Sequence, residues 1–346
     1  MAKCLRHLTG VAHLLQRFSD PVTQCSSPTR RTTLEWYCNL EDYCCFVTAT
    51  PQLLPVTWRQ ENVRQRQQLA HLEYPRLSGI ERKARLLDDL WAQLWELLPQ
   101  MAKVLTTLPR LKTLDGEDRF RAAMMLQSQL ELFERDLKGF VEYPHVKDVF
   151  ESIDLTPPSP CNHTTCCPER PFTPLVLEFP PAGFLKMTVL AIQAYNKTCL
   201  WPPIQKELGL RDTFLPLDTI AIEIMRTFAG LEYMFGDCYD ALFPCFSPLS
   251  IAGMTCPLKM RPWLWHKLSH FEQLGEYVFI PLKKRLAFLW NLPKLSKEGF
   301  GAWRCCPPDH AVRDLDVGDI ALVSQMATLE LHDDATTTDV TIVRDG

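Results

Sequence analysis

The stretch "DGEDRFRAAMMLQSQLELFERDLKG", residues 115–139, decides the fold class because it has the pattern of one long amphipathic helix. Asp115 is placed to cap its amino end, and Glu117 and Asp118 suit the positive end of the helix dipole. Its apolar residues recur at helical spacing and form a predicted core face: Phe120, Met124, Leu130, Phe133 and Leu137. The sequence predicts a helix over 116–138.

Four further helices are predicted before this one. Residues 3–18 carry one apolar stripe at helical spacing, made of Leu5, Leu8, Val11, Ala12 and Leu15. A loop rich in Ser, Pro and Thr follows at 19–33, and "LEWYCNLEDYCCFVT" then suits a buried helix. The next two predicted helices are residues 57–73 and 79–98. The inner stripe of the second consists of Leu86, Leu87, Leu90, Leu94 and Leu97, flanked by Trp91 and Trp95.

The second half of the chain begins after a proline-rich stretch. Eight prolines between 154 and 181 are too many for a regular element, so this part is predicted to be a linker or surface loop. A helix over 183–197 follows, and Asp218 is predicted to cap the next one. After an apolar connection at 238–260, two helices are predicted with a break near Pro281, because proline lacks the backbone donor that a helix interior needs.

These elements predict an all-α protein. We expect a multi-helix body of two blocks, 1–153 and 183–296, with the proline- and cysteine-rich loop 154–182 between them. An acidic and largely irregular tail, 297–346, is expected to follow, with weak strand character in "DVTIV".

Composition limits the class of protein. Apolar residues make up 46% and charged residues 23%, which is globular rather than disordered. No apolar run approaches the roughly 18 residues that a membrane-spanning helix needs. The first residues do not read as a signal peptide, since Arg6 and His13 interrupt their apolar stretch. We therefore expect a soluble intracellular protein whose fourteen cysteines are thiols, mostly used as small core residues.

One cysteine-rich segment, "CNHTTCCPERP", raises the question of a metal site. Cys161, His163, Cys166 and Cys167 are ligand types that zinc accepts, but structural zinc usually uses two close pairs on separate turns. Adjacent cysteines make joint ligation awkward, and the chain has no Cys-x-x-Cys pair. We predict a loop with packed thiols and no metal.

No catalytic motif stands out, so we predict neither an enzyme nor a cofactor. Asp88 and Asp89 in "LLDDLW" leave open an all-helical enzyme of the terpene-cyclase kind, which binds diphosphate through magnesium. Such an enzyme needs a further acid and a second ligand set, and the sequence shows neither. His266 and His270 lie four residues apart on one helix face, but the third ligand of a metal site is missing.

Charge is distributed unevenly along the chain. Residues 58–85 carry seven Arg or Lys against three Glu, and residues 309–346 carry nine acids against two Arg. A basic helix face binds phosphate without regard to sequence, whereas solvated faces are the commoner cause of such runs. We interpret both runs as solvated faces, with a weak contact to transcription machinery as the alternative for the acidic one.

Several segments together resemble a known family. "HLTGVAHLL", "LEWYCNLEDYCCF" and the long stretch from "AIEIMRTFAGLEYMFGDCYDALFPCF" to "RPWLWHKLSHFEQLG" are similar to the regulatory region of fungal zinc-cluster transcription factors. The resemblance covers most of residues 5–292 and is strongest at 219–292. It implies a helical, nuclear regulator of a secondary-metabolite gene cluster that works through protein partners.

The family's DNA-reading zinc cluster has no counterpart in this sequence. We expect either that exons encoding it are missing upstream or that the protein reaches DNA through a partner, which includes a second copy of itself. Aromatic residues gather in 228–290, and most of them should be core. Those that stay exposed would form the partner or effector surface, for which the candidates are Phe235, Trp263, Trp265, His266 and Trp290.

Overall fold

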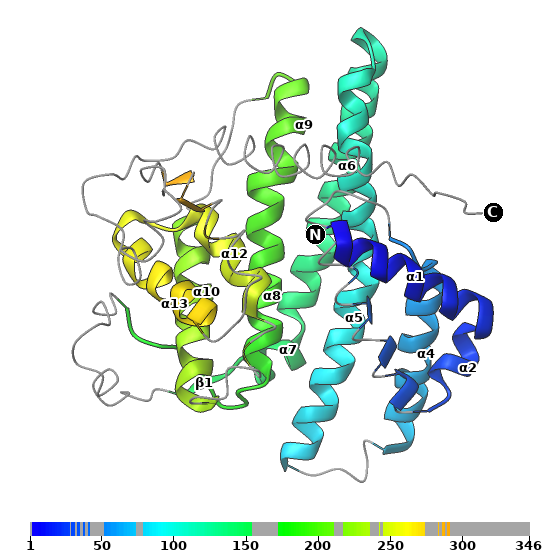
Figure 1. The fold of residues 1–346 in the computed structure, drawn as a ribbon, viewed down its shortest axis with the longest axis vertical. Coiled ribbons are helices and arrows are strands. Elements are labelled where there is room, and N and C mark those ends of the chain that lie inside the picture. Colours follow the sequence, from blue (N-terminus) through cyan, green and yellow to red (C-terminus); the bar gives the residue numbers. More distant parts are fainter. Residues whose placement is uncertain are drawn as a thin grey trace, which may run out of the picture. The chain divides into compact units, whose positions relative to one another are not determined.

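The computed structural model describes residues 2–27, 29–31, 33–34, 37–38, 41, 52–73, 79–153, 172–210, 217–235, 242, 245–273, 283, 286–287 and 289–290. Helices account for 85% of this part of the chain, and it contains only two short strands (Figure 1). The predicted all-α fold class is therefore confirmed.

The chain forms two compact units. Unit 1 contains the described residues of 1–78 and 88–140, and unit 2 contains those of 79–87 and 141–321. The predicted blocks placed the end of the first half at 153. In the structure, residues 141–153 belong to unit 2, because the strand at 152–153 pairs with a strand from the second half of the chain.

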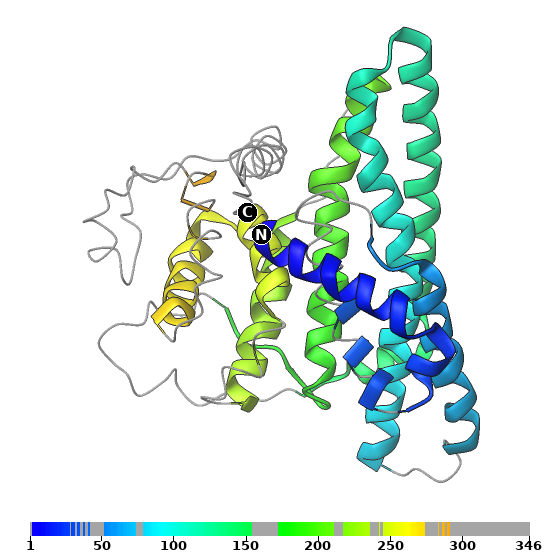
Figure 2. The same ribbon diagram turned by 45° about the vertical axis from the view of Figure 1, so that its right-hand side comes forward.

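Unit 1 is built around a helical hairpin. Helix α5 (Gly79–Thr107) lies in unit 1 from Asp88 onward, and a 3-10 turn, Leu108–Thr113, joins it to α6 (Gly116–Glu142). Figures 1 and 2 both show the two helices side by side and antiparallel, and Gln100 Nε2 donates to Asp136 Oδ2 across them at 3.5 Å. The other helices of this unit are α1 (Ala2–Phe18), α2 (Pro21–Cys25) and α4 (Val56–Glu73).

Helix α6 confirms the opening prediction but shifts its core face. The carbonyl of Asp115 accepts the first helical bond, from Arg119 N at 3.2 Å. The buried residues are Ala123, Leu126, Leu130, Phe133, Leu137 and Phe140, which follow a strict alternation of three and four. The prediction that Phe120 and Met124 belong to the core is wrong. Their side chains are 46% and 51% exposed, because each lies one position beside this line of buried residues.

Two other predictions for unit 1 need correction or extension. The loop predicted at 19–33 contains α2, which begins after Asp20 with Pro21 in the first turn, a favoured helix start. Helix α5 continues past the predicted end at residue 98 and through Pro99. In the segment predicted as a buried helix, the described residues are helical and buried, namely Leu34, Tyr37, Cys38 and Glu41.

Unit 2 has a core of three helices that pack against one another, α8 (Ala182–Tyr195), α10 (Leu217–Phe235) and α12 (Phe246–Thr255). Its other elements are α7 (Pro144–Val149), β1 (Ser152–Ile153), β2 (Val176–Leu177), α9 (Trp201–Glu207) and α13 (Arg261–Gln273). The strands are antiparallel, with Ser152 opposite Leu177.

The segment that leads into β2 lies directly on α10. Leu175 N donates to the carbonyl of Arg226 at 2.9 Å, and the Arg226 side chain donates back to the Thr173 carbonyl at 2.9 Å. A Cβ atom at Gly230 would lie 1.9 Å from the Leu175 carbonyl oxygen. Only glycine permits this approach of backbone to helix.

Three predictions for the second half change. Strand β2 lies inside the proline-rich stretch that was predicted to hold no regular element, and α12 lies inside the predicted apolar connection 238–260. Asp218 lies in the first turn of α10 rather than before it. The helix predicted over 183–197 continues through a π-helical turn, Asn196–Leu200, into α9.

The π turn has a local cause. Pro202 and Pro203 have no N–H, so they cannot bond carbonyls one turn back. The predictions for 154–171, for the break near Pro281 and for the tail from 297 lie outside the described residues.

Candidate interaction surface on helix α1

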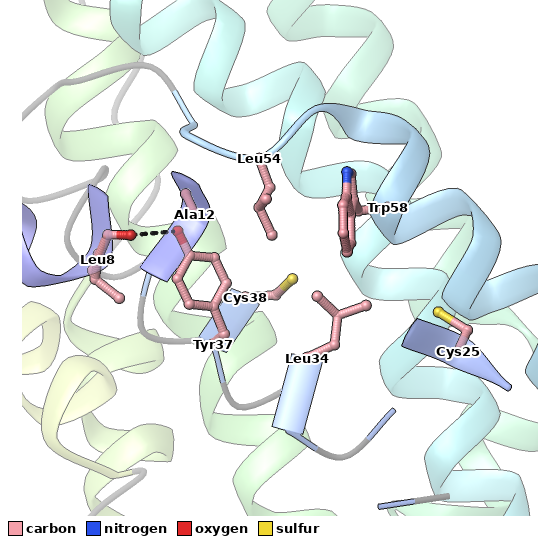
Figure 3. Close-up of a cluster of buried hydrophobic side chains, with 8 residues drawn as sticks. All are labelled: Leu8, Ala12, Cys25, Leu34, Tyr37, Cys38, Leu54 and Trp58. Carbon is pink, nitrogen blue, oxygen red and sulfur yellow. Dashed lines mark hydrogen bonds between the residues drawn. The ribbon is translucent and has the colours of Figure 1, made fainter. Parts of the chain in front are cut away.

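Helix α1 is held to unit 1 by one of its faces. Eight buried side chains from separate segments pack together there (Figure 3): Leu8, Ala12, Cys25, Leu34, Tyr37, Cys38, Leu54 and Trp58. The Tyr37 hydroxyl donates to the Leu8 carbonyl at 3.2 Å. The inner face of α1 is therefore fixed by both apolar packing and a buried hydrogen bond.

A buried carboxylate fixes the same region. Glu41 is fully buried, and its Oε1 accepts from Leu53 N at 2.6 Å and from Leu54 N at 2.8 Å. Its Oε2 accepts from Arg59 at 2.5 Å, a pair in which both side chains are almost completely buried. Both oxygens are thus used by structural partners, which suits a structural role rather than a catalytic one.

The outer face of α1 carries an exposed apolar line. Val11 is 41%, Leu14 58% and Phe18 73% exposed, and Val22 in α2 adds another exposed apolar side chain. At 100° per residue, the first three lie within about 60° of the helix circumference and extend over about 10 Å. We call Val11, Leu14 and Phe18 the α1 ridge.

The ridge extends the predicted apolar stripe beyond the part that is packed in the core. Val11 was grouped with Leu8, Ala12 and Leu15, but it lies about 60° from Leu8 and faces outward with Leu14. The apolar sector of α1 therefore has a part packed in the core and an exposed edge, the α1 ridge. A contiguous exposed apolar patch can mark a contact site, whereas single exposed apolar side chains are ordinary.

Two exposed basic side chains, Arg6 and Arg17, lie on the side of α1 next to Leu14. Helix α1 contains Lys3, Arg6 and Arg17 and two histidines, and it contains no acidic residue. Arg6 and Arg17 are exposed, and the Arg17 guanidinium lies 5.3 Å from the centre of the Phe18 ring. The outer face combines an apolar line with positive charge, the combination expected of a surface that docks an acidic, partly apolar partner.

The predicted partner surface in unit 2 is largely core. Trp263, Trp265 and Trp290 are 3%, 1% and 0% exposed, so these side chains offer no contact area to a partner. They pack among aromatic rings, with Trp265 and Trp290 5.9 Å apart between ring centres. Phe235 and His266 are partly exposed, and Phe235 lies against Phe184 at 5.8 Å.

The basic stretch 58–85 is only partly a solvated face. Arg59 and Arg66 are 3% and 8% exposed, contrary to the interpretation of this run as solvated. Arg66 pairs with Asp88 at 3.3 Å, and Arg64 on the exposed side of α4 pairs with Glu61 at 2.5 Å. The buried Arg59 and Arg66 of α4 thus form ion pairs with Glu41 and Asp88 of unit 1.

The described residues hold no group of three or more His, Cys, Asp or Glu side chains that could bind a metal ion. Cys161, His163, Cys166, Cys167 and the His270 side chain lie outside the described part. The side chain of Asp88 is 52% exposed, and Asp89 is half-buried on the next position of α5.

The buried thiols of unit 2 are chemically quiet. Burial raises the pKa of Cys245 well above the ordinary thiol value, and burial likewise raises the pKa of Cys256 despite the opposing charge of Arg261. Because the thiolate is the reactive form, neither side chain is suited to nucleophilic or metal chemistry near neutral pH. Their role is packing, as predicted for most cysteines.

The membrane prediction can be compared with the described helices. None of them combines the length and the apolar character needed to cross a bilayer.

Comparisons with protein-family models, with curated proteins and with solved structures find no match to this chain. The resemblance to zinc-cluster regulators therefore stays a prediction.

Sequence reasoning missed the α1 ridge, although a signal for it was present. Val11, Leu14 and Phe18 have the spacing i, i+3, i+7, and the helix around them has bases without acids. A broad apolar sector on one short helix would have indicated one part for the core and one for a partner.

Proposed function

We propose that this protein is a non-enzymatic helical regulator or co-regulator of transcription that acts through protein partners. The observation that carries the proposal is the α1 ridge, an exposed apolar line on a helix whose neighbouring face is anchored in the core. The transcriptional context, with nuclear location and control of a fungal secondary-metabolite cluster, rests on the family resemblance alone.

The anchoring of α1 supports a binding role. A surface that binds tightly is best presented on a rigid element, since little conformational entropy is then lost on association. Leu8, Ala12 and the Tyr37–Leu8 hydrogen bond hold α1 against the core, so the α1 ridge keeps one orientation. Apolar side chains on such a helix are suitable anchors for a partner.

A tethering experiment tests this function. The full chain is fused to an unrelated DNA-binding module in a fungal cell that carries a matching reporter gene, and reporter output is compared with that of the module alone. We expect reporter output to rise or fall several-fold, because a partner recruited by the tethered chain would alter transcription of the reporter gene. Unchanged output from a stably folded fusion would contradict the proposal.

Two further measurements on the purified chain separate the alternatives. We expect no sequence-selective retention of DNA in an electrophoretic shift assay, because the proposal assigns DNA contact to a partner. We also expect no magnesium-dependent turnover of allylic diphosphates. Turnover that is lost on Asp89→Ala would replace the regulator by the all-helical enzyme.

A further inference from the structure

We propose that the α1 ridge binds an acidic amphipathic helix of a partner protein. This inference rests on the proposed function and names the chemistry of the partner. It follows from three properties of α1, namely the shape of the exposed apolar line, the charge beside it and the packing of the neighbouring face in the core.

The shape of the ridge fits a helix. Val11, Leu14 and Phe18 form a narrow line about 10 Å long, equal to roughly two helical turns. Such a line fits the groove between two side-chain rows of a second helix. Val22 lengthens the apolar surface beyond the end of α1 and is 54% exposed.

The narrowness of the ridge also argues against a lipid surface. A helix that lies in a bilayer interface buries its whole apolar face about 5–10 Å into the headgroup boundary. On α1, the rest of the apolar sector is packed against the core and exposed His7 lies in line with the ridge at its amino-terminal end, so the exposed apolar line is only about 60° wide. A partner helix needs the narrow line, whereas a membrane needs the whole apolar face.

Charge selects an acidic partner. The exposed cations Arg6 and Arg17 have no acidic residue on the same helix. A glutamate-rich helix placed over the ridge would meet these cations on its polar face. The same argument disfavours a second copy of α1, since like charges would then face one another.

Synthetic peptides of about 18 residues can test this chemistry. The first has leucines at i, i+3, i+4 and i+7 with glutamates elsewhere, the second replaces the glutamates by lysines, and the third scrambles the first. Binding to the full chain is measured by fluorescence anisotropy. We expect the glutamate peptide to bind about tenfold or more tightly than either of the others.

Variants of the full chain assign the binding to α1. We expect Leu14→Gln with Phe18→Gln to weaken binding of the glutamate peptide about tenfold or more, because buried anchors dominate such contacts. Arg6→Gln with Arg17→Gln should weaken it and flatten its dependence on salt. Matched controls on α6 are Met124→Gln and Arg135→Gln, which change exposed side chains and should leave binding unchanged.

Several outcomes would overturn the inference. For the peptides, these are equal binding of the glutamate and lysine peptides, or no binding of any peptide. For the variants, it is binding of the glutamate peptide that survives Leu14→Gln with Phe18→Gln. For lipid, it is ridge-dependent binding to phosphatidylserine vesicles in place of the peptide. If the peptide fails while the tethered reporter responds, the partner chemistry is wrong and the proposed function stands. If the peptide binds and the reporter is silent, the surface stands without the transcriptional role.

Discussion

Both units bury cationic side chains, but they surround them differently. In unit 1, Arg59 lies against the buried carboxylate of Glu41 at 2.5 Å. In unit 2, the Lys283 ammonium lies 4.9 Å from the centre of the Trp265 ring, and the Arg261 guanidinium lies 5.5 Å from that of Trp290. The buried Arg59 of unit 1 thus pairs with a carboxylate, whereas the two buried cations of unit 2 have aromatic faces among their contacts.

The difference predicts different sensitivities. A buried ion pair fails badly when one partner is removed, because the other is left as an uncompensated charge. A cation on an aromatic face loses about 0.5–2 kcal/mol when the ring is changed. Unit 1 should therefore be the more sensitive to single polar substitutions, and unit 2 to changes in packing. Hydrogen exchange can follow each unit separately.

The largest effect is expected from Glu41→Gln. This change leaves the buried Arg59 without its counter-charge, and we expect unit 1 to lose about 3–5 kcal/mol of unfolding free energy. Hydrogen exchange of α4 amides measures it. Glu61→Gln is the matched control, because its partner Arg64 is half-exposed, and it should lose no more than about 1 kcal/mol. Equal losses in the two variants would remove the distinction drawn for unit 1.

Gly230→Ala should give the next largest effect, in unit 2. The new Cβ would lie 1.9 Å from the Leu175 carbonyl oxygen, so backbone must move, at a cost of about 1–3 kcal/mol or more. Gly139→Ala on α6 is the control, since nothing lies within 4 Å of its Cβ position, and it should stabilise by about 0.5–1 kcal/mol. Urea unfolding measures the free energy of unfolding of both variants. An unchanged free energy for Gly230→Ala would show that the close approach of the Leu175 carbonyl to α10 is not required.

Trp290→Phe tests the buried hydrogen bond that the Trp290 indole makes in unit 2. In a continuing helix, the Gly253 carbonyl would accept a hydrogen bond from the backbone N–H of residue 257, but Pro257 has no N–H. Trp290 Nε1 donates to this carbonyl at 3.1 Å. Phenylalanine keeps a ring and removes the donor, so we expect a loss of about 1–3 kcal/mol from unit 2.

Thermal unfolding of Trp290→Phe is compared with that of Trp91→Phe, in which a half-buried indole is changed. The Trp91 variant should lose less than about 1 kcal/mol. If the Trp290 variant were as stable as wild type, the buried indole N–H would have no structural role.

The smallest effect concerns the exposed carboxylate of Asp20. Hydrogen bonds from the Thr23 side chain at 2.6 Å and backbone N–H at 3.0 Å lower its pKa. Because the folded pKa is below the unfolded value of about 3.9, the stabilisation is present at neutral pH and is lost as pH falls through the folded pKa.

Thermal unfolding of wild type and Asp20→Ala measures this difference. The gap between their melting temperatures should be largest near pH 7 and should shrink below about pH 4. Asp20→Asn, which retains a capping side chain, is the control and should stay closer to wild type at neutral pH. A gap that does not change with pH would mean that the cap acts without its charge.

The helices could be predicted where periodicity is strong. Residues 116–138 and 79–98 have regular apolar spacing, and α6 and α5 cover them. The Phe120 and Met124 errors arose because spacing alone does not say which of two adjacent apolar positions meets the neighbouring helix. Helix α12 was missed because "FSPLSIAGMT" is apolar all round and has no period to detect.

The polar core of unit 1 could not be predicted from spacing. Glu41 and Arg59 are 18 residues apart in the chain, and each resembles an ordinary surface residue in its segment. The tryptophans of unit 2 were candidates for a partner surface because they are large and aromatic. Burial of Trp263, Trp265 and Trp290 depends on tertiary packing, which a single sequence does not display.

The most direct test of the account separates the two faces of α1 in the tethered reporter. Leu14→Asp with Phe18→Asp changes only exposed side chains, so it should leave the melting temperature within about 2 °C and abolish the reporter response. Leu8→Asp changes a buried side chain, so it should abolish the reporter response and also lower the melting temperature by several degrees. A normal response from the Leu14→Asp, Phe18→Asp double variant would contradict the claim that this protein works through the α1 ridge.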